Sequence, residues 1–304
     1  MTSAGLLAVR AEWGGRQFGQ IAVRLQRPPV AQLFVGQIPE AVVKTIPYLY
    51  TLCAHAQRAA AQAALAAAMG EARRPVDDGE LWVELLHENF WRLLLDWPTA
   101  LGLPPAQSAF AAWRAARQGS QCLAETQKLI AVSVRPMAAA CLMRLDETVP
   151  SSAAGGEVPG MPELAPETWL AYWQGLSPQP PALARPASPQ AAFRGRLAEV
   201  EQAAEALASG APYPVVAAGG DGWGVAQTIT ARGILTHAVH VDDGRVLRYR
   251  VVAPTDIHFA DAAALTELLA GRQAESPEAG RQLLEQAVLA LDPCLPYTLE
   301  LNDA

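Results

Sequence analysis

The stretch TITARGILTHAVHVDDGRVLRYRVVAP, residues 228–254, carries the strongest fold signal in the chain. Apolar and polar residues alternate on both sides of Asp243-Gly244, which is the pattern of strands with one buried face. Asp-Gly is a preferred two-residue hairpin turn because both residues accept the positive φ angles that a type I′ turn requires. The sequence therefore predicts an antiparallel hairpin formed by residues 228–241 and 245–254.

A second hairpin is predicted near the N-terminus. The runs LLAVRAEW (6–13) and QIAVRLQR (20–27) both alternate, and GGR (14–16) between them favours a turn. The Pro28-Pro29 pair ends the second run, and AQLFVG (31–36) is interpreted as a third strand.

Between these strands, residues 40–147 are predicted to be helical. The Ala-rich run 48–70 uses the best helix former and stops at a glycine. A second helix, 77–97, is expected to end at Pro98. The other expected helices are residues 122–145, kinked at Pro136, followed by 191–210, 260–271 and 277–291. The predicted fold class is therefore α+β, with a central helical bundle and antiparallel strands or hairpins toward both ends of the chain.

Residues 148–190 differ from the rest in composition. They are dense in Pro, Gly and Ser, which predicts a long excursion with at most one short helix, around Glu167–Trp173. This segment is either a linker between two domains or an insertion within one. We interpret residues 1–304 as a single domain that contains it.

Length and composition limit the function classes. The chain has 304 residues, of which 51% are hydrophobic, which supports a sizeable core and excludes disorder throughout. Its formal charge of −7 argues against a nucleic-acid partner, because phosphate binding needs a basic surface. Polar residues interrupt the longest Ala-rich stretch, so no membrane span is expected. Four scattered cysteines and the lack of a signal-peptide pattern predict a reducing, cytoplasmic location.

Common cofactor and metal motifs are missing from the sequence. GGDGWG (219–224) lacks the strand and helix context of a dinucleotide site and is interpreted as a tight turn. His237 and His240 are expected on opposite faces of one strand, which is poor geometry for a shared metal. His87 is interpreted as a solvated residue on a charged helix face.

The cysteines differ in their expected settings. Cys122 and Cys141 lie on apolar helices and are interpreted as buried, inert thiols. Cys294 follows a helix in a Pro-bounded loop, where a thiol can be presented.

Four short motifs occur in a recognisable order: Cys53, ARG at 231–233, APT at 253–255 and DPC at 292–294. In this order they resemble the large subunit of nickel–iron hydrogenases. The resemblance is closer to the HupK/HoxV family of hydrogenase-maturation proteins, which are similar to that subunit but lack its full metal site. It implies a hydrogenase-large-subunit-like fold.

The resemblance implies a reduced metal site. The enzymes carry two CxxC motifs; here Tyr50 and Cys53 stand at the first, and Cys294 and Tyr297 at the second. The family fold brings the two motifs together, so Cys53 and Cys294 are expected to be close and are the predicted metal ligands. Nickel in the family is held by four thiolates, so no nickel is expected here. The family's iron carries two cyanides and one carbonyl and needs only two sulfur ligands.

The resemblance also implies contacts to the diatomic ligands. The family places an Arg from a PRG-like motif beside them and a Pro-Ser/Thr segment against the cyanides. The matching residues here are Arg232, Pro254 and Thr255, and Ala231 stands where the PRG-like motif has its proline. Because cyanide nitrogens accept hydrogen bonds, a guanidinium, a hydroxyl and backbone N–H groups suit them.

Two departures from the enzyme pattern bear on activity. The RGxE motif, whose Glu relays protons, has no counterpart near residues 34–37, and Glu300 stands where the C-terminal motif of the enzyme has His. Neither a proton path nor proteolytic processing is therefore expected, and the chain is predicted not to be an enzyme.

The first functional hypothesis is an assembly factor that transiently holds the iron–dicyanide–carbonyl unit. Its expected partners are hydrogenase maturation proteins and the large-subunit precursor. The alternative is a metal-free chaperone that binds the precursor or a maturation partner through its helices, with Trp169 and Trp173 as anchors. A third interpretation, a relative serving a respiratory complex, is disfavoured by Cys53 and the DPC motif.

Overall fold

The predicted hairpin at Asp243-Gly244 is part of a four-stranded antiparallel sheet in the order β3-β4-β5-β6. The computed structural model describes residues 5–146, 162–181 and 184–303, so residues 148–161 and 182–183 of the Pro- and Gly-rich excursion lie outside the described residues. The strands of this sheet are β3 (Val215–Gly220), β4 (Trp223–Thr230), β5 (Gly233–Asp242) and β6 (Arg245–Val252). Asp221-Gly222 and Asp243-Gly244 both have positive φ and form the tight turns that the sequence predicted.

The predicted long strand 228–241 is wrong in one respect, because it contains a turn. Thr230 pairs with Gly233, so the chain reverses at Ala231-Arg232. Gly233 has a φ of +117°, which a residue with a Cβ rarely adopts. Arg232 therefore lies at the tip of a hairpin and not within a strand.

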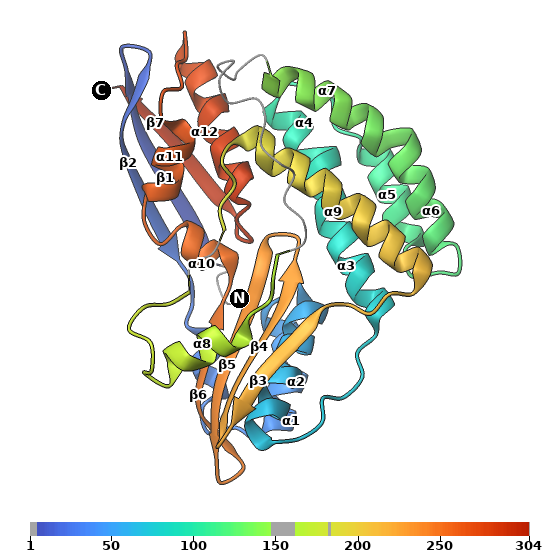
Figure 1. Ribbon diagram of the computed structural model, residues 1–304. Helices are drawn as coiled ribbons and strands as arrows, with labels where there is room; N and C mark the ends of the chain where they lie inside the picture. The colour runs from blue at the N-terminus through green and yellow to red at the C-terminus, as the bar shows by residue number, and fades with distance from the viewer. Residues whose placement is uncertain (1–4, 147–161, 182–183, 304) are drawn as a thin grey trace.

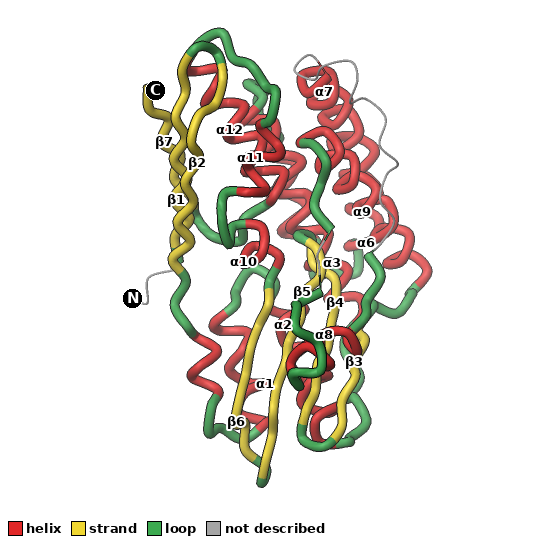
Figure 2. Tube along the Cα trace, turned by 60° about the vertical axis from the view of Figure 1, so that its left-hand side comes forward, coloured by secondary structure: helices red, strands yellow, loops and turns green. Residues whose placement is uncertain are grey.

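Two helices from distant parts of the chain cover the two faces of this sheet (Figure 2). Helix α2 (Ala54–Met69) packs on the face that carries Ala226, and α8 (Pro166–Trp173) packs on the face that carries Val225. Consecutive residues of β4 point to opposite faces of the sheet. Because a helix covers each face, the residues on both faces of β4 are buried. A Cβ on Gly224 would overlap the backbone of α2, which explains a glycine facing an Ala-rich helix.

A second, three-stranded sheet joins the two ends of the chain. Strands β1 (Leu6–Gly14) and β2 (Gln17–Gln26) form the predicted N-terminal hairpin. The C-terminal strand β7 (Tyr297–Asp303), which was not predicted, pairs with β1 in parallel. The predicted third strand at 31–36 is wrong: Val30–Phe34 form a 3-10 helix after two prolines that lack an N–H donor.

The helices form a bundle beside the sheets and a smaller group against β1 and β2 (Figure 1). The bundle consists of α3 (Asp78–Trp91), a π-helical turn (Arg92–Asp96), α4 (Trp97–Ala100), α5 (Gln107–Ala116), α6 (Cys122–Leu129), a second π turn (Ile130–Val134), α7 (Arg135–Asp146) and α9 (Pro189–Ser209). The remaining helices are α1 (Pro39–Leu49), α10 (Pro254–His258), α11 (Ala263–Leu269) and α12 (Pro277–Leu291).

The helix predicted to end at Pro98 continues to Ala100. A π turn precedes this proline, and the carbonyl of Leu94, which Pro98 cannot bond, accepts the N–H of Ala106 at 2.8 Å. Pro136 likewise follows a π turn. Such a turn lets a helix pass a proline without leaving the preceding carbonyls unpaired.

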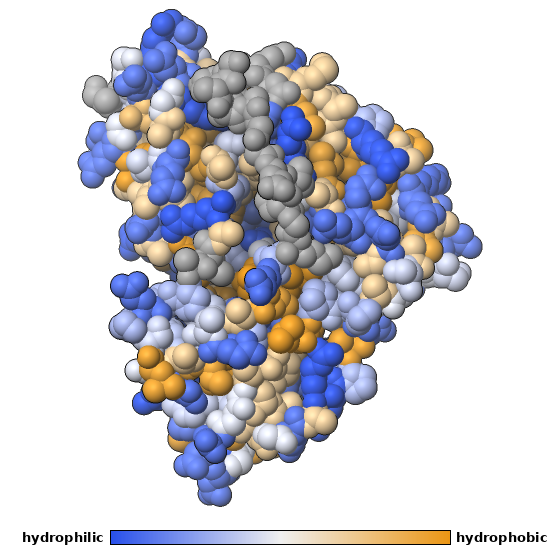
Figure 3. Space-filling model, viewed as in Figure 1, coloured by the Kyte–Doolittle hydropathy of each residue, from blue (hydrophilic) through white to orange (hydrophobic). Residues whose placement is uncertain are grey.

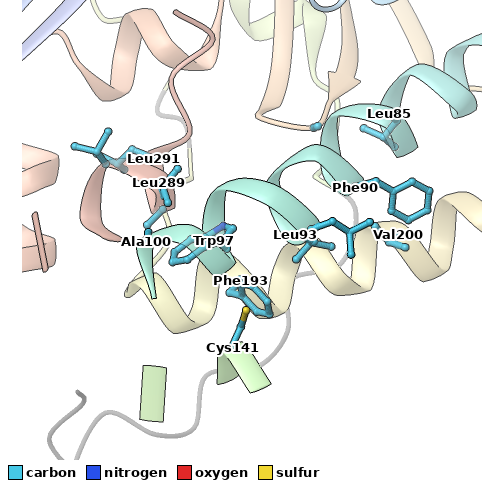
Figure 4. Packing of buried hydrophobic residues seen from close by; sticks show 14 of the residues in the cluster. Leu85, Phe90, Leu93, Trp97, Ala100, Cys141, Phe193, Val200, Leu289 and Leu291 are labelled. Atoms are coloured by element: carbon cyan, nitrogen blue, oxygen red, sulfur yellow. The ribbon is translucent and has the colours of Figure 1, made fainter. Parts of the chain in front are cut away.

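The helical bundle packs around large aromatic side chains (Figure 4). Trp97 and Phe193 meet edge to face with their ring centroids 5.4 Å apart, next to the fully buried Cys141. Hydrophilic residues spread over most of the face seen in Figure 3, with smaller hydrophobic patches between them. Within the described residues, no helix combines the length and apolar composition that crossing a membrane requires.

Candidate functional site

Cys53 lies at a break between two helices. The predicted continuous helix 48–70 is divided, since α1 ends at Leu49 and α2 begins at Ala54, with Cys53 as its N-cap residue. The side chain of Glu84 on α3 accepts the N–H groups of His55 and Ala56 at 2.8 and 2.9 Å. This carboxylate caps α2 and fixes the start of the helix beside the thiol.

Cys294 lies in the loop after α12, as predicted, and several donors converge on it. Arg27 Nη2 donates to its sulfur at 2.8 Å, and Thr255 Oγ1 donates to the same sulfur at 3.2 Å. The backbone N–H of Cys294 donates in return to Thr255 Oγ1 at 3.1 Å. Donors of this kind, one of them charged, suit a thiolate.

The structure brings Cys53 and Cys294 into one electrostatic environment, although 241 positions separate them in the sequence. Burial is the main cause that raises the pKa of Cys53 to about 12, with a further contribution from the negative charge of Glu84. Arg232 opposes this shift, and the Cys294 sulfur adds to it. Tyr50 stands at the first position of the first CxxC motif. Burial raises its pKa to about 12, and the sulfurs of Cys53 and Cys294 both add to this shift.

Arg232 lies at the tip of the β4–β5 turn, which reaches toward α3 and the end of α12 (Figure 1), and its side chain is 5% exposed. Its Nη2 donates to Glu88 at 2.7 Å, and its Nε lies 3.7 Å from Asp292. Burial alone lowers the pKa of Arg232, but Asp292 and Glu88 outweigh it and raise that pKa. Within the described chain, its Nε and Nη1 atoms have no hydrogen-bond partner.

Asp292 organises the buried charges behind the two cysteines. Arg92 Nε donates to it at 2.6 Å and Arg196 Nη2 at 2.8 Å, and Arg196 also donates to the carbonyl of Ala231. Burial would raise the pKa of Asp292, but the surrounding arginines outweigh burial and hold that pKa well below its usual range. Asp292 has a φ of +45° at the end of α12, so this network also orients the loop that carries Cys294.

The unpaired N–H groups of Arg232 fit a ligand that accepts hydrogen bonds. A buried donor without a partner is unfavourable, and such groups are rare in native proteins. Among the described residues, no group of three or more His, Cys, Asp or Glu side chains is arranged to hold a metal ion.

Pro254 and Thr255 start the short helix α10, so the predicted strand 245–254 is too long and ends at Val252. Both are buried, and Thr255 is fully shielded from solvent. The hydroxyl of Thr255 faces Cys294, so this residue holds one of the two sulfurs in place.

Tyr297 stands at the second position of the second CxxC motif. It begins β7 and hydrogen-bonds Glu285. Its electrostatic neighbours also include Arg92, Asp96 and Asp292. It therefore belongs to the carboxylate and arginine side of the network, whereas Tyr50 lies among the sulfurs.

Several interpretations of other residues need correction. His87 is not solvated: its side chain is 15% exposed and stacks against Trp113. Trp169 is 3% exposed and belongs to a core cluster under α8, so it is not available as a partner anchor. Cys141 is buried as predicted, whereas Cys122 is only partly buried.

Sequence reasoning missed two residues that contact the sulfurs. Arg27 follows β2 and precedes two prolines, and nothing in that pattern distinguishes it from other arginines of the strand. Gln57 lies one helical turn after Cys53 and donates to its sulfur at 3.6 Å. The spacing of four residues on a helix is the signal that was available for Gln57.

Comparison with known proteins gives relatives along nearly the whole chain, although no family model matches it. The hydrogenase expression/formation protein HupV of Azotobacter chroococcum mcd 1 is 31% identical, over 99% of this chain and 100% of the relative. The hydrogenase expression/formation protein HupK of Azotobacter vinelandii is 30% identical with the same coverage of 99% and 100%.

Solved structures agree on the fold. A variant of the [NiFeSe] hydrogenase from Desulfovibrio vulgaris Hildenborough matches with a TM-score of 0.61 and 13% identity, over 96% of this chain and 99% of that chain. An NAD⁺-reducing [NiFe]-hydrogenase matches with a TM-score of 0.55 and 15% identity, over 91% and 92% of the two chains. The fold is that of hydrogenase large subunits, as predicted. The chain belongs to the HupK/HupV/HoxV family of hydrogenase expression/formation proteins.

Proposed function

We propose that this protein is a non-enzymatic assembly factor for a nickel–iron hydrogenase, consistent with the names of its relatives. Its cargo is an iron atom that carries two cyanides and one carbonyl. Cys53 and Cys294 hold this unit transiently. Maturation proteins supply it, and the large-subunit precursor receives it.

One observation carries the proposal. Two cysteines from opposite ends of the chain share one environment beside Arg232, a buried guanidinium whose Nε and Nη1 have no hydrogen-bond partner among the described residues. The sulfurs would bind iron, and Arg232 would donate to a cyanide nitrogen. Thr255 and the start of α10, at Pro254, support the Cys294 side of the site.

Tyr50 argues against a complete nickel site. A phenol whose pKa is about 12 stays protonated at neutral pH, and a phenolic oxygen is a poor ligand for a metal that the enzymes bind through sulfur. Two thiolates also bind more weakly than four. Transfer to a recipient with the full set of cysteines therefore runs downhill in free energy.

The test is an infrared spectrum and an iron determination on protein purified without oxygen from a host that makes active hydrogenase. Wild-type protein is expected to show iron together with cyanide and carbonyl bands. A Cys53→Ala/Cys294→Ala double variant is expected to lose both. A Cys122→Ala/Cys141→Ala double variant is the matched control, since it removes the two cysteines outside the site. This control is expected to keep both the iron and the cyanide and carbonyl bands.

Bands that survive unchanged in the Cys53→Ala/Cys294→Ala variant would contradict iron ligation by these residues. A blank spectrum of wild-type protein that still binds the large-subunit precursor would support a metal-free chaperone. The burial of Trp169 removes one of the two anchors predicted for that alternative.

A further inference from the structure

A buried chain of hydrogen bonds leads from the core of the four-stranded sheet to Cys53. Tyr249 Oη on β6 lies 2.8 Å from His237 Nδ1 on β5. His237 Nε2 lies 2.9 Å from Gln57 Oε1 on α2, and Gln57 Nε2 donates to Cys53 Sγ at 3.6 Å. The exposed fractions of Tyr249, His237 and Gln57 are 9%, 0% and 2%.

The chemistry of these groups fixes the direction of every hydrogen bond. An amide nitrogen only donates and an amide oxygen only accepts, so Gln57 needs a donor at its Oε1 when its Nε2 faces the sulfur. The donor is His237 Nε2–H. Full burial lowers the pKa of His237 to about 3, so the ring is neutral and carries one proton. His237 Nδ1 must then accept, and the Tyr249 hydroxyl supplies the donor.

We infer that Tyr249 and His237 are positioning residues that act through Gln57 to keep an N–H donor on the sulfur of Cys53. Tyr249 selects the Nε2–H tautomer of His237. That tautomer selects the orientation of the Gln57 amide. Both ring nitrogens of His237 have hydrogen-bond partners, so this residue orients the chain of hydrogen bonds and does not bind metal.

The value of this arrangement to the protein rests on the proposed function. Cys53 is one of the two proposed iron ligands, and Gln57 Nε2 is the donor placed on its sulfur. A neutral N–H donor holds a ligating sulfur in position and brings no counter-charge into the site. The geometry itself holds for the protein without iron, so it is testable without cargo.

The test compares two substitutions of His237 in the full-length, iron-free protein. The rate of Cys53 alkylation by iodoacetamide at pH 8 is measured by mass spectrometry. His237→Gln keeps an amide N–H that can donate to Gln57, and it is expected to alkylate at close to the wild-type rate. His237→Phe keeps a ring of similar volume but has no donor, and its rate of Cys53 alkylation is expected to be about fivefold below that of wild type. A packing role for His237 would give the opposite order.

Tyr249→Phe and Tyr213→Phe form a matched pair. Each removes one buried hydroxyl, but that of Tyr213 donates to the carbonyl of Ile229 and lies outside the chain of hydrogen bonds. Only Tyr249→Phe is expected to slow Cys53 alkylation, by about threefold. Equal rates in His237→Phe and wild type would overturn the inference.

A spectroscopic measurement covers the case in which a variant does not fold. In wild-type protein labelled with [¹⁵N]histidine, NMR is expected to show His237 protonated at Nε2 and bare at Nδ1. A proton at Nδ1 would contradict the inference directly. Neither measurement uses iron, so a blank infrared spectrum would count against the proposed function and leave this result standing.

Discussion

The guanidinium of Arg27 donates to the sulfur of Cys294 at 2.8 Å, and its Nε lies 3.2 Å from Asp256 on α10. Arg27 therefore ties the end of the N-terminal hairpin to the loop after α12. Its side chain is 21% exposed, in contrast to 5% for Arg232. One arginine thus holds the site from the solvent side and the other from the interior.

Replacing Arg27 with Gln is expected to reduce the iron that remains after anaerobic purification several-fold, because Cys294 loses its charged donor. Stability should fall by only about 1 kcal/mol, since the ion pair with Asp256 is partly exposed. Arg24→Gln, on the same hairpin, is the matched control and should retain iron. Equal iron contents in the two variants would show that Arg27 does not hold the cargo.

The Arg232→Met variant is expected to be much less stable, because Glu88 and Asp292 would lose a buried positive partner. Breaking one member of a buried ion network typically costs about 3–5 kcal/mol. Arg135→Ala removes an exposed pair with Glu201 and should cost about 1 kcal/mol or less. Urea unfolding measures both. A small effect in Arg232→Met would mean that the network contributes little to folding.

Glu199 predicts a dependence of stability on pH. Burial is the main cause that raises its pKa to about 7, whereas its ordinary value is 4.5. Between these values the folded state keeps a proton that the unfolded state releases, so stability is highest below pH 4.5 and falls as the pH rises through 7.

The Glu199→Gln variant should lack this part of the pH dependence. It is expected to gain roughly 2 kcal/mol relative to wild type between pH 5 and 8 in denaturant titrations. Glu201→Gln changes an exposed carboxylate on the same helix and should follow the wild-type curve. Parallel curves for wild type and Glu199→Gln would show that Glu199 is not protonated in the folded protein.

Gly224→Ala tests the contact between α2 and the four-stranded sheet. The added methyl group would overlap the carbonyl of Ala64 and lie 2.7 Å from the nitrogen of Ala68. Neither backbone can move without disturbing α2, so a loss of about 3 kcal/mol is expected. At Gly220 an added Cβ meets nothing within 4 Å, and Gly220→Ala should change stability by only about 0.5 kcal/mol. Thermal unfolding of both variants decides the point.

Local sequence patterns predicted elements that depend on neighbouring residues. Alternation and Asp-Gly turns identified the hairpins at both ends, and Ala-rich or amphipathic spacing identified α2, α3, α9 and α12. Boundaries failed where a distant contact overrode the local pattern. The carbonyl of Leu94 finds a partner at Ala106, so the helix passes Pro98, and the chain turns at Ala231-Arg232 within one alternating run.

The sequence by itself determined which residues of the site are present. It contains one cysteine of each expected pair, Arg232 and Thr255 in the expected order, and tyrosines at the other two positions. Only the tertiary structure decided what surrounds them. Arg27, the chain from Tyr249 to Cys53 and the partners of Asp292 come from segments up to 267 positions apart. Such contacts depend on how the two sheets and the bundle pack, and no local spacing encodes them.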